Sequence, residues 1–202
     1  MMEKTKYFTE AALEAIARNE LKNFKPTLVT GEPHAIPIEK MVEIYYGLEL
    51  DYRHIRQHGT ILGCTVFDDA LLPIWEPEIN DYTLIPVKGG TIVIDMTLLK
   101  TQNAGRLRFT IAHELAHWLI HQELYAGERI AATHLKKTSM DENPVVERQA
   151  NIIATSLLMP KGQVKRAFYA IRNKPDCVEL LAKHFGVSNQ AMKIFMEAHN
   201  MT

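Results

Sequence analysis

The order of strand-like and helix-like segments constrains the fold of this chain most strongly. Short segments rich in Ile, Val, Leu and Thr predict strands at residues 60–67, 70–75, 83–87 and 91–96. Helical periodicity bounded by proline and glycine predicts helices at 7–24, 37–47, 104–122, 145–159, 161–172, 176–185 and 189–199. Strands grouped between helices predict an α+β fold with a small, mostly antiparallel sheet packed on the helix at 104–122. Lys88, Gly89 and Gly90 are expected to form a hairpin turn between the last two strands.

The chain is expected to form a single compact unit, because no internal repeat and no Gly/Ser/Pro-rich linker divides it. Residues 1–36 would be an N-terminal helical extension, and the remaining domain, 37–202, would end in a C-terminal helical bundle. Residues 123–143 have no strong pattern and predict a loop with a short helical piece. Loops of that length often act as lids over functional sites.

The composition is that of an ordinary globular protein, with 202 residues, 47% hydrophobic, 23% charged and a formal net charge of -1. A domain of this size buries enough surface to fold without a disulfide or a structural metal, so a bound metal is expected to be functional. Cys64 and Cys177 are too few for a disulfide framework. No signal peptide and no membrane-spanning apolar run is present, which predicts a cytoplasmic protein with no membrane contact.

The residues that carry chemistry lie within the predicted helix at 104–122. His113, Glu114 and His117 form the HExxH spacing. Two histidines four residues apart lie one helical turn above each other, so both imidazoles can reach one zinc ion. The intervening Glu114 projects beside the ion, where it can accept a proton from the attacking water.

The surroundings of this motif favour a real metal site over a chance match. Leu107, Ile111, Leu115 and Leu119 place one face of the helix in a core, and further apolar residues cover much of the remaining surface. Histidines and a glutamate in a mostly buried helix are costly unless they bind something.

A catalytic zinc site needs a third protein ligand, for which Glu147 is the best candidate. It heads an inward-facing stripe of the helix at 145–159, where a carboxylate needs a cation. His121 is eight residues from His113, about 12 Å along a helix, so it cannot close on the same ion and is expected to be an exposed residue near the helix end. The alternatives left open are Glu123, Glu128, Glu142 and His134.

Other HExxH enzymes fit the sequence less well. A metzincin places its third histidine six residues after the second, where this chain has Glu123, and has glycine where this chain has Ile120. Peptide deformylases use a cysteine ligand, and Cys64 lies on a predicted strand upstream. It is expected instead to fill the core as a small apolar side chain.

The alternative hypothesis involves no catalysis. The protein would then be a zinc-binding regulator that binds a repressor or DNA through its C-terminal helices. Residues 178–201 resemble two helices joined by a short turn, as in helix-turn-helix proteins. The second of these helices offers Lys193 as its only lysine or arginine and also carries Glu197, which would face phosphate. Direct nucleic-acid binding is therefore not expected.

The strand at 91–96, RFTIAHELAHW at 108–118 and ERQANIIATSLLMP at 147–160 together resemble the ImmA/IrrE family of metallopeptidases. The similarity extends from about residue 37 to about residue 185. It implies a minimal thermolysin-like core, with one zinc ion on His113, His117 and Glu147 and with Glu114 as general base. Several members of this bacterial and phage-borne family act on helix-turn-helix repressors encoded beside them and so relieve repression of mobile elements or stress genes. Many also carry an N-terminal helix-turn-helix domain, for which the first 36 residues are too short.

The implied reaction is zinc-dependent cleavage of a protein substrate, for which the resemblance suggests such a repressor. The substrate is expected to lie extended along a sheet edge, added to the strand at 91–96 or to a neighbouring strand. The tetrahedral oxyanion needs a stabilising group, and Tyr125, His134 and Arg148 have suitable chemistry. Their spacing does not assign the role to one of them.

Overall fold

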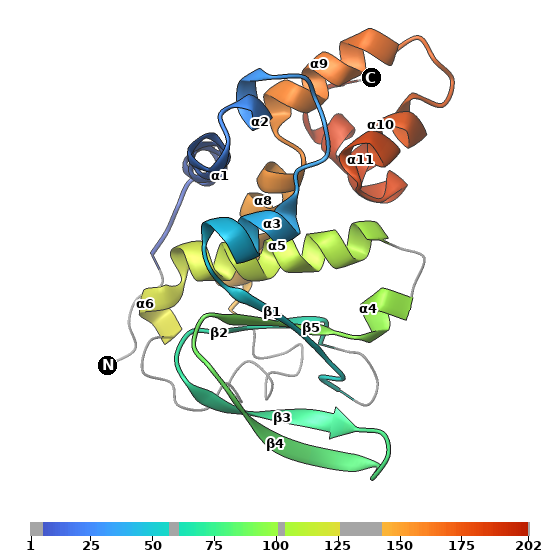
Figure 1. Cartoon of the computed structure of the whole chain (residues 1–202). Coiled ribbons are helices and arrows are strands. Elements are labelled where there is room, and N and C mark those ends of the chain that lie inside the picture. The colour runs from blue at the N-terminus through green and yellow to red at the C-terminus, as the bar shows by residue number, and fades with distance from the viewer. Residues whose placement is uncertain (1–5, 57–60, 101–103, 126–142, 202) are drawn as a thin grey trace.

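The computed structural model describes residues 6–56, 61–100, 104–125 and 143–201, in which five short strands lie on one side of most of the helices (Figure 1). The strands are β1 (Glu49–Arg53), β2 (Gly63–Val66), β3 (Ala70–Glu76), β4 (Asp81–Val87) and β5 (Thr91–Asp95). The helices are α1 (Glu10–Phe24), α2 (Thr27–Thr30), α3 (Ile38–Lys40), the π-helix η1 (Met41–Tyr45), α4 (Thr97–Lys100), α5 (Ala104–Ile120), α6 (Gln122–Tyr125), α8 (Pro144–Leu158), α9 (Lys161–Ile171), α10 (Cys177–Phe185) and α11 (Asn189–Ala198). The predicted α+β class is confirmed.

The strands form two sheets, of which the larger has the order β1-β5-β2. β1 is parallel to β5, and β2 is antiparallel to it, so Val93 at the centre of β5 lies opposite both Asp51 and Cys64. Every residue of β5 is buried. β3 and β4 form a separate antiparallel hairpin. Two of the three strand pairs are therefore antiparallel, as predicted.

The predicted hairpin at Lys88, Gly89 and Gly90 is wrong. β4 pairs with β3, whereas β5 pairs with β1 and β2. The glycines do turn the chain, since Gly90 has φ +85° and its N–H donates to the carbonyl of Val66 at 2.8 Å. This turn leads from one sheet into the other, because the fully buried β5 is paired on both sides whereas β4 is exposed along much of its length.

Strand β1 was not predicted, because three of its five residues are charged. Its apolar side chains, Leu50 and Tyr52, alternate with Glu49, Asp51 and Arg53, as expected of a strand at a sheet edge. That alternation was the signal available in the sequence.

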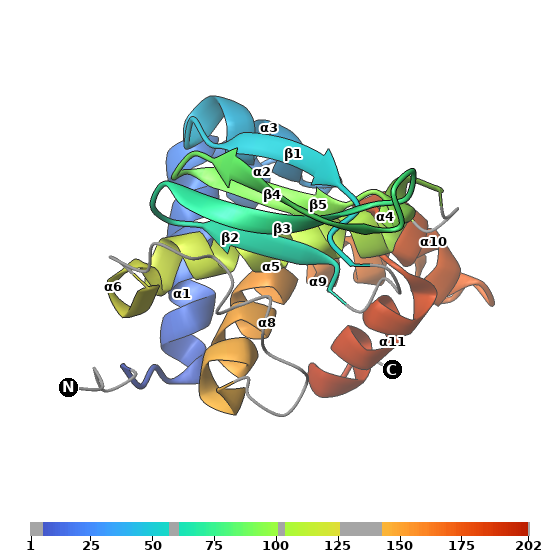
Figure 2. The same cartoon turned by 90° about the horizontal axis from the view of Figure 1, so that it is seen from below.

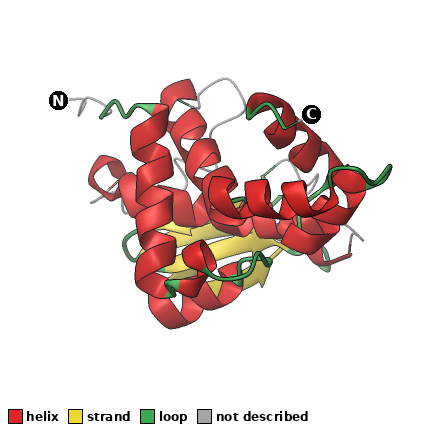
Figure 3. Ribbon diagram, turned by 90° about the horizontal axis from the view of Figure 1, so that it is seen from above, coloured by secondary structure: helices red, strands yellow, loops and turns green. Residues whose placement is uncertain are grey.

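Helix α5 lies between the larger sheet and the remaining helices. It contacts β2 and β5 on one side and α8 on the other, and α1 packs against α8 in turn. Figure 1 shows the sheets below α5 and most of the other helices above it, with α4 and α6 as exceptions, and Figure 2 shows the same sheets nearest the viewer. Seen from above, helices cover the sheet (Figure 3). Leu13, Ala17 and Leu21 of α1 join Ile111 of α5 and Ile153 of α8 in one hydrophobic core.

The C-terminal helices α9, α10 and α11 form a second cluster around Phe168, Leu181, Phe185 and Met192. A glycine ends α10 because Gly186 has φ +66°, a conformation that glycine adopts without strain. Ser188 then caps α11 by accepting a hydrogen bond from the N–H of Ala191 at 3.1 Å. Within the described residues, no helix has the length and apolarity required to cross a membrane.

The helix predicted at 7–24 begins three residues later, because the side chain of Thr9 caps it by accepting from the N–H of Ala12 at 3.3 Å. The helix predicted at 37–47 widens into η1, where the N–H of Tyr46 donates to the carbonyl of Met41, five residues back. The loop predicted at 123–143 begins with α6, and its residues from 126 to 142 lie outside the described part of the chain.

Candidate metal centre

The rotation of α5 directs its motif residues to different neighbours. Ile111 and Leu115 are fully buried and fix that rotation. His113 and His117 consequently face α8, while Glu114 faces β2. The two imidazoles of the motif therefore lie on the side of α5 that faces α8, and the carboxylate of Glu114 lies on the adjacent side that faces β2.

The acidic partner of the histidines is supplied by the first turn of α8. Asn143 caps this helix by accepting from the N–H of Val145 at 3.1 Å, and Pro144 occupies the first turn. These residues set the start of the helix and thereby the direction of Glu147, which is 28% exposed in its side chain. Glu147 points toward α5 rather than into solvent.

Three potential ligand atoms converge between α5 and α8. Nε2 of His113 is 3.0 Å from Nε2 of His117 and 3.2 Å from Oε2 of Glu147. Nε2 of His117 is 3.6 Å from Oε1 of the same carboxylate. The ligand atoms of His113, His117 and Glu147 all lie within 4.8 Å of one another. Over the described ranges, no other group of three or more His, Cys, Asp or Glu residues meets this criterion.

His113 is oriented by Asn151, one turn further along α8. Nδ1 of His113 lies 3.1 Å from Oδ1 of Asn151, so this nitrogen carries the proton and Nε2 faces Glu147 with its lone pair. Burial lowers the pKa of His113, but the carboxylates of Glu147 and Glu114 outweigh it and the net pKa is raised. A proton therefore competes with a cation for Nε2.

Glu114 is buried beside this cluster and is held by Thr65 of β2. The hydroxyl of Thr65 lies 2.8 Å from Oε2 of Glu114 and 2.9 Å from its backbone carbonyl oxygen. Burial raises the pKa of Glu114, and the charge of His113 and the hydrogen bond from Thr65 oppose it without reversing the shift. A carboxylate with a raised pKa accepts a proton more readily than an ordinary glutamate does.

Gly63 gives the Glu114 carboxylate its space, a role that was not predicted from the sequence. A Cβ at position 63 would lie 2.7 Å from Oε1 of Glu114 and 2.9 Å from Cγ2 of Thr110. Only glycine fits here without displacing the carboxylate. Neither Gly63 nor Thr65 could be found from sequence spacing, because both meet Glu114 through a long-range strand-to-helix contact.

The chain matches a model of the IrrE N-terminal-like domain, peptidase family M78, over residues 94–197. The match covers just over half of the chain, from β5 to α11. The chain belongs to this family. A comparison with curated proteins gave no match. The resemblance expected from the sequence is confirmed, and membership of an M78 family supports a metallopeptidase-type function.

In this M78 domain the predicted ligands His113, His117 and Glu147 form a cluster compatible with a metal site. The prediction for His121 was wrong with respect to exposure: the residue is 1% exposed and belongs to the interior. Nδ1 of His121 contacts Nδ1 of His117 at 3.1 Å, and Nε2 contacts Oε1 of Gln149 at 3.0 Å. Burial lowers the pKa of His121.

Other candidates for ligands of the M78 domain are not part of the cluster or lie outside the described residues. Cys64 is buried and outside the ligand cluster, and burial raises the pKa of its thiol. Glu123 pairs instead with Lys6 at the surface. Glu128, Glu142 and His134 lie outside the described residues.

Two residues suggested as oxyanion stabilisers have other contacts. Arg148 pairs with Glu10 at 3.1 Å. Tyr125 stacks on Phe67, with ring centroids 5.5 Å apart. Neither lines the cleft at the candidate metal site, and His134, the third suggestion, is not among the described residues.

A cleft of about 310 Å³ opens onto the candidate metal site of the M78 domain. Ile61, Leu62 and Gly63 line one side, and Phe109 and Asn151 line another. A second groove of about 670 Å³ shares Phe109, Glu147 and Asn151 with it and continues between α8 and α11. The accessible space at the site is therefore elongated.

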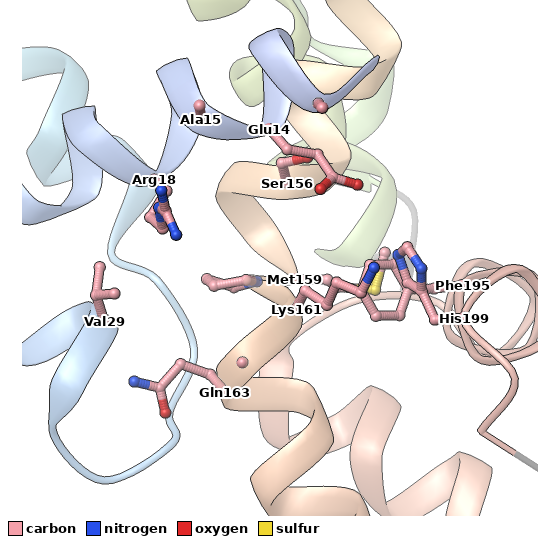
Figure 4. Close-up of a pocket in the computed structure, with 13 residues that line it drawn as sticks. Glu14, Ala15, Arg18, Val29, Ser156, Met159, Lys161, Gln163, Phe195 and His199 are labelled. Atoms are coloured by element: carbon pink, nitrogen blue, oxygen red, sulfur yellow. The ribbon is translucent and has the colours of Figure 1, made fainter.

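Another cavity, of about 470 Å³, lies between α1, α8, α9 and α11 (Figure 4). Arg18, Lys161 and Gln163 line it together with apolar residues such as Met159. None of the three clustered ligand residues lines it. Gln163 is 2% exposed, and both polar atoms of its side chain lack a hydrogen-bond partner among the described residues. We assign no chemistry to this cavity.

Proposed function

We propose that this chain is a zinc-dependent endopeptidase. The observation that carries the proposal is the convergence of Nε2 of His113, Nε2 of His117 and the Glu147 carboxylate. Two imidazoles and one carboxylate, with a further position left for water, are a ligand set of catalytic zinc. Atoms bound about 2.0–2.1 Å from a tetrahedral ion stand about 3.3–3.4 Å apart, and the observed separations of 3.0–3.6 Å bracket that value.

Zinc held by these residues would supply Lewis acidity toward a peptide carbonyl and would acidify the attacking water. The protein must supply the base. Glu114 has one oxygen, Oε2, bonded to Thr65, and its other oxygen, Oε1, lies against Gly63, which lines the cleft. We propose that Glu114 accepts the proton of the attacking water and passes it to the leaving amine. Burial suits this role because it raises the pKa of the carboxyl.

The substrate is proposed to lie along β2. The expectation that β5 could accept an added strand is wrong, since β1 and β2 occupy both of its edges. Among the described strands, β2 pairs with β5 alone, and its residues Gly63 and Cys64 line the cleft. An extended peptide could therefore add to its second edge by main-chain hydrogen bonds. The groove between α8 and α11 would receive the substrate beyond the cleaved bond.

We further propose that the protein substrate is a helix-turn-helix repressor in a bacterial mobile-element or stress-response system. This step rests on the resemblance to the ImmA/IrrE family. Cutting such a repressor would relieve repression. The two cysteines, Cys64 and Cys177, are free and buried, as suits the proposed cytoplasmic location.

The test is incubation of the purified protein with the helix-turn-helix repressor encoded nearest its gene, with zinc and with a chelator. We expect cleavage that the chelator abolishes and that Glu114→Gln lacks while retaining zinc. A repressor bound tightly but left intact at equal zinc content would contradict the proposal and favour the non-proteolytic regulator.

A further inference from the structure

A buried hydrogen-bond chain runs from His117 away from the candidate metal site. Nδ1 of His117 contacts Nδ1 of His121 at 3.1 Å, and Nε2 of His121 contacts Oε1 of Gln149 at 3.0 Å. Nε2 of Gln149 then donates to the backbone carbonyl of Lys6 at 2.8 Å. His117, His121 and Gln149 are at most 4% exposed, so their side chains find these partners within the protein interior.

The far end of this chain fixes the direction of every hydrogen bond in it. Because Nε2 of Gln149 donates to Lys6, its Oε1 faces His121 and must accept. Nε2 of His121 therefore carries a hydrogen. In a neutral imidazole the other nitrogen then holds a lone pair, so Nδ1 of His121 accepts from Nδ1–H of His117.

This direction determines which nitrogen of His117 is available to a metal. With the hydrogen on Nδ1, the lone pair of Nε2 points toward Nε2 of His113 and the carboxylate of Glu147. The opposite tautomer would place a hydrogen between these groups and exclude a cation. Metal-binding histidines usually donate their second nitrogen to a fixed acceptor, which orients the ring and raises its basicity.

We propose that His121 and Gln149 are positioning residues that, with the Lys6 carbonyl, hold His117 in its metal-binding tautomer. The inference rests on the metal site of the proposed function. It assigns a purpose to a third histidine that lies too far along the helix axis to join the first two on one ion. It also connects the segment before α1 with the site.

The deciding experiment is long-range ¹H–¹⁵N NMR of histidine-labelled, metal-free protein at about pH 9, where imidazoles of ordinary pKa are neutral. We expect the Nδ1–H tautomer for His117 and the Nε2–H tautomer for His121. The Nε2–H tautomer for His117, or the Nδ1–H tautomer for His121, would overturn the proposal. This readout needs no variant and no peptidase activity.

Variants then measure the consequence for metal binding. Gln149→Leu and His121→Phe should each weaken zinc affinity about 10- to 100-fold in a competition titration with a chelator. Gln163→Leu is the matched control, because Gln163 is equally buried but bonds to nothing in the described structure, and it should leave zinc affinity unchanged. If both variants fold, bind zinc as tightly as wild type and keep His117 in its Nδ1–H form, the proposal is wrong.

The outcomes separate this inference from the proposed function. Zinc binding with the expected tautomers but no cleavage of any peptide would support the positioning role and contradict the peptidase. Zinc-dependent cleavage by a protein in which His117 and His121 have the reversed tautomers would support the peptidase and contradict the positioning role.

Discussion

The substitution Gly63→Ala tests how closely the fold positions the proposed general base. The added Cβ would lie 2.7 Å from Oε1 and 2.8 Å from Cγ of Glu114, whereas ordinary contacts begin at 3.4 Å. The carboxylate must therefore move by about 0.7 Å or β2 must shift away from α5. A misplacement of about 1 Å at a catalytic group can reduce a rate by about 10²-fold, so we expect kcat/KM to fall by roughly 10- to 100-fold.

Stability should change less than activity in this variant. Adding a methyl group to a packed site costs about 1–3 kcal/mol of the free energy of unfolding, measurable by urea denaturation. Zinc content should remain that of wild type, because Glu114 is not among the clustered ligands.

Gly162→Ala is the matched control for Gly63→Ala. A Cβ at position 162 meets nothing within 4 Å, so this variant should keep wild-type activity. Peptide cleavage by Gly63→Ala within about twofold of wild type, at equal zinc content, would refute the argument that the space at residue 63 sets the position of Glu114.

Three further predictions concern the charged groups of the site. Glu114→Gln should keep bound zinc and lose about 10²- to 10⁴-fold in peptide cleavage, and an undiminished rate would remove the general-base role. Glu147→Ala should lose bound zinc, as measured by elemental analysis, and an unchanged metal content would move the third ligand elsewhere. Because the pKa of His113 is raised in the metal-free protein, its proton competes with zinc as the pH falls through that pKa. Zinc affinity measured by chelator competition should accordingly decrease on acidification, with proton release on binding, and a pH-independent affinity would contradict this.

The sequence was sufficient to predict the helices that carry the site. The apolar period around the HExxH residues and the proline before Val145 predict α5 and α8 nearly to the residue. Local periodicity and capping fix such helices, so their faces can be assigned from spacing. The juxtaposition of Glu147 with both histidines follows from those faces.

The contacts that support the site could not be predicted in the same way. Thr65 and Gly63 reach Glu114 only because β2 packs on α5, and nothing in their local sequence encodes that pairing. The strand partners of β5 are likewise distant in sequence. Gly89 and Gly90 resemble a hairpin turn and led to the wrong prediction that β5 pairs with β4. His121 was misjudged because its burial depends on Gln149 of another helix.

The buried series of hydrogen bonds ends at the backbone carbonyl of Lys6, which lies just before α1. A truncation or an affinity tag introduced just upstream of α1 would therefore alter how firmly the purified protein retains its metal ion. The altered segment lies far in sequence from all three metal ligands. Preparations that differ only in the segment before α1 should be compared for metal retention before any difference in their activity is attributed to the substrate.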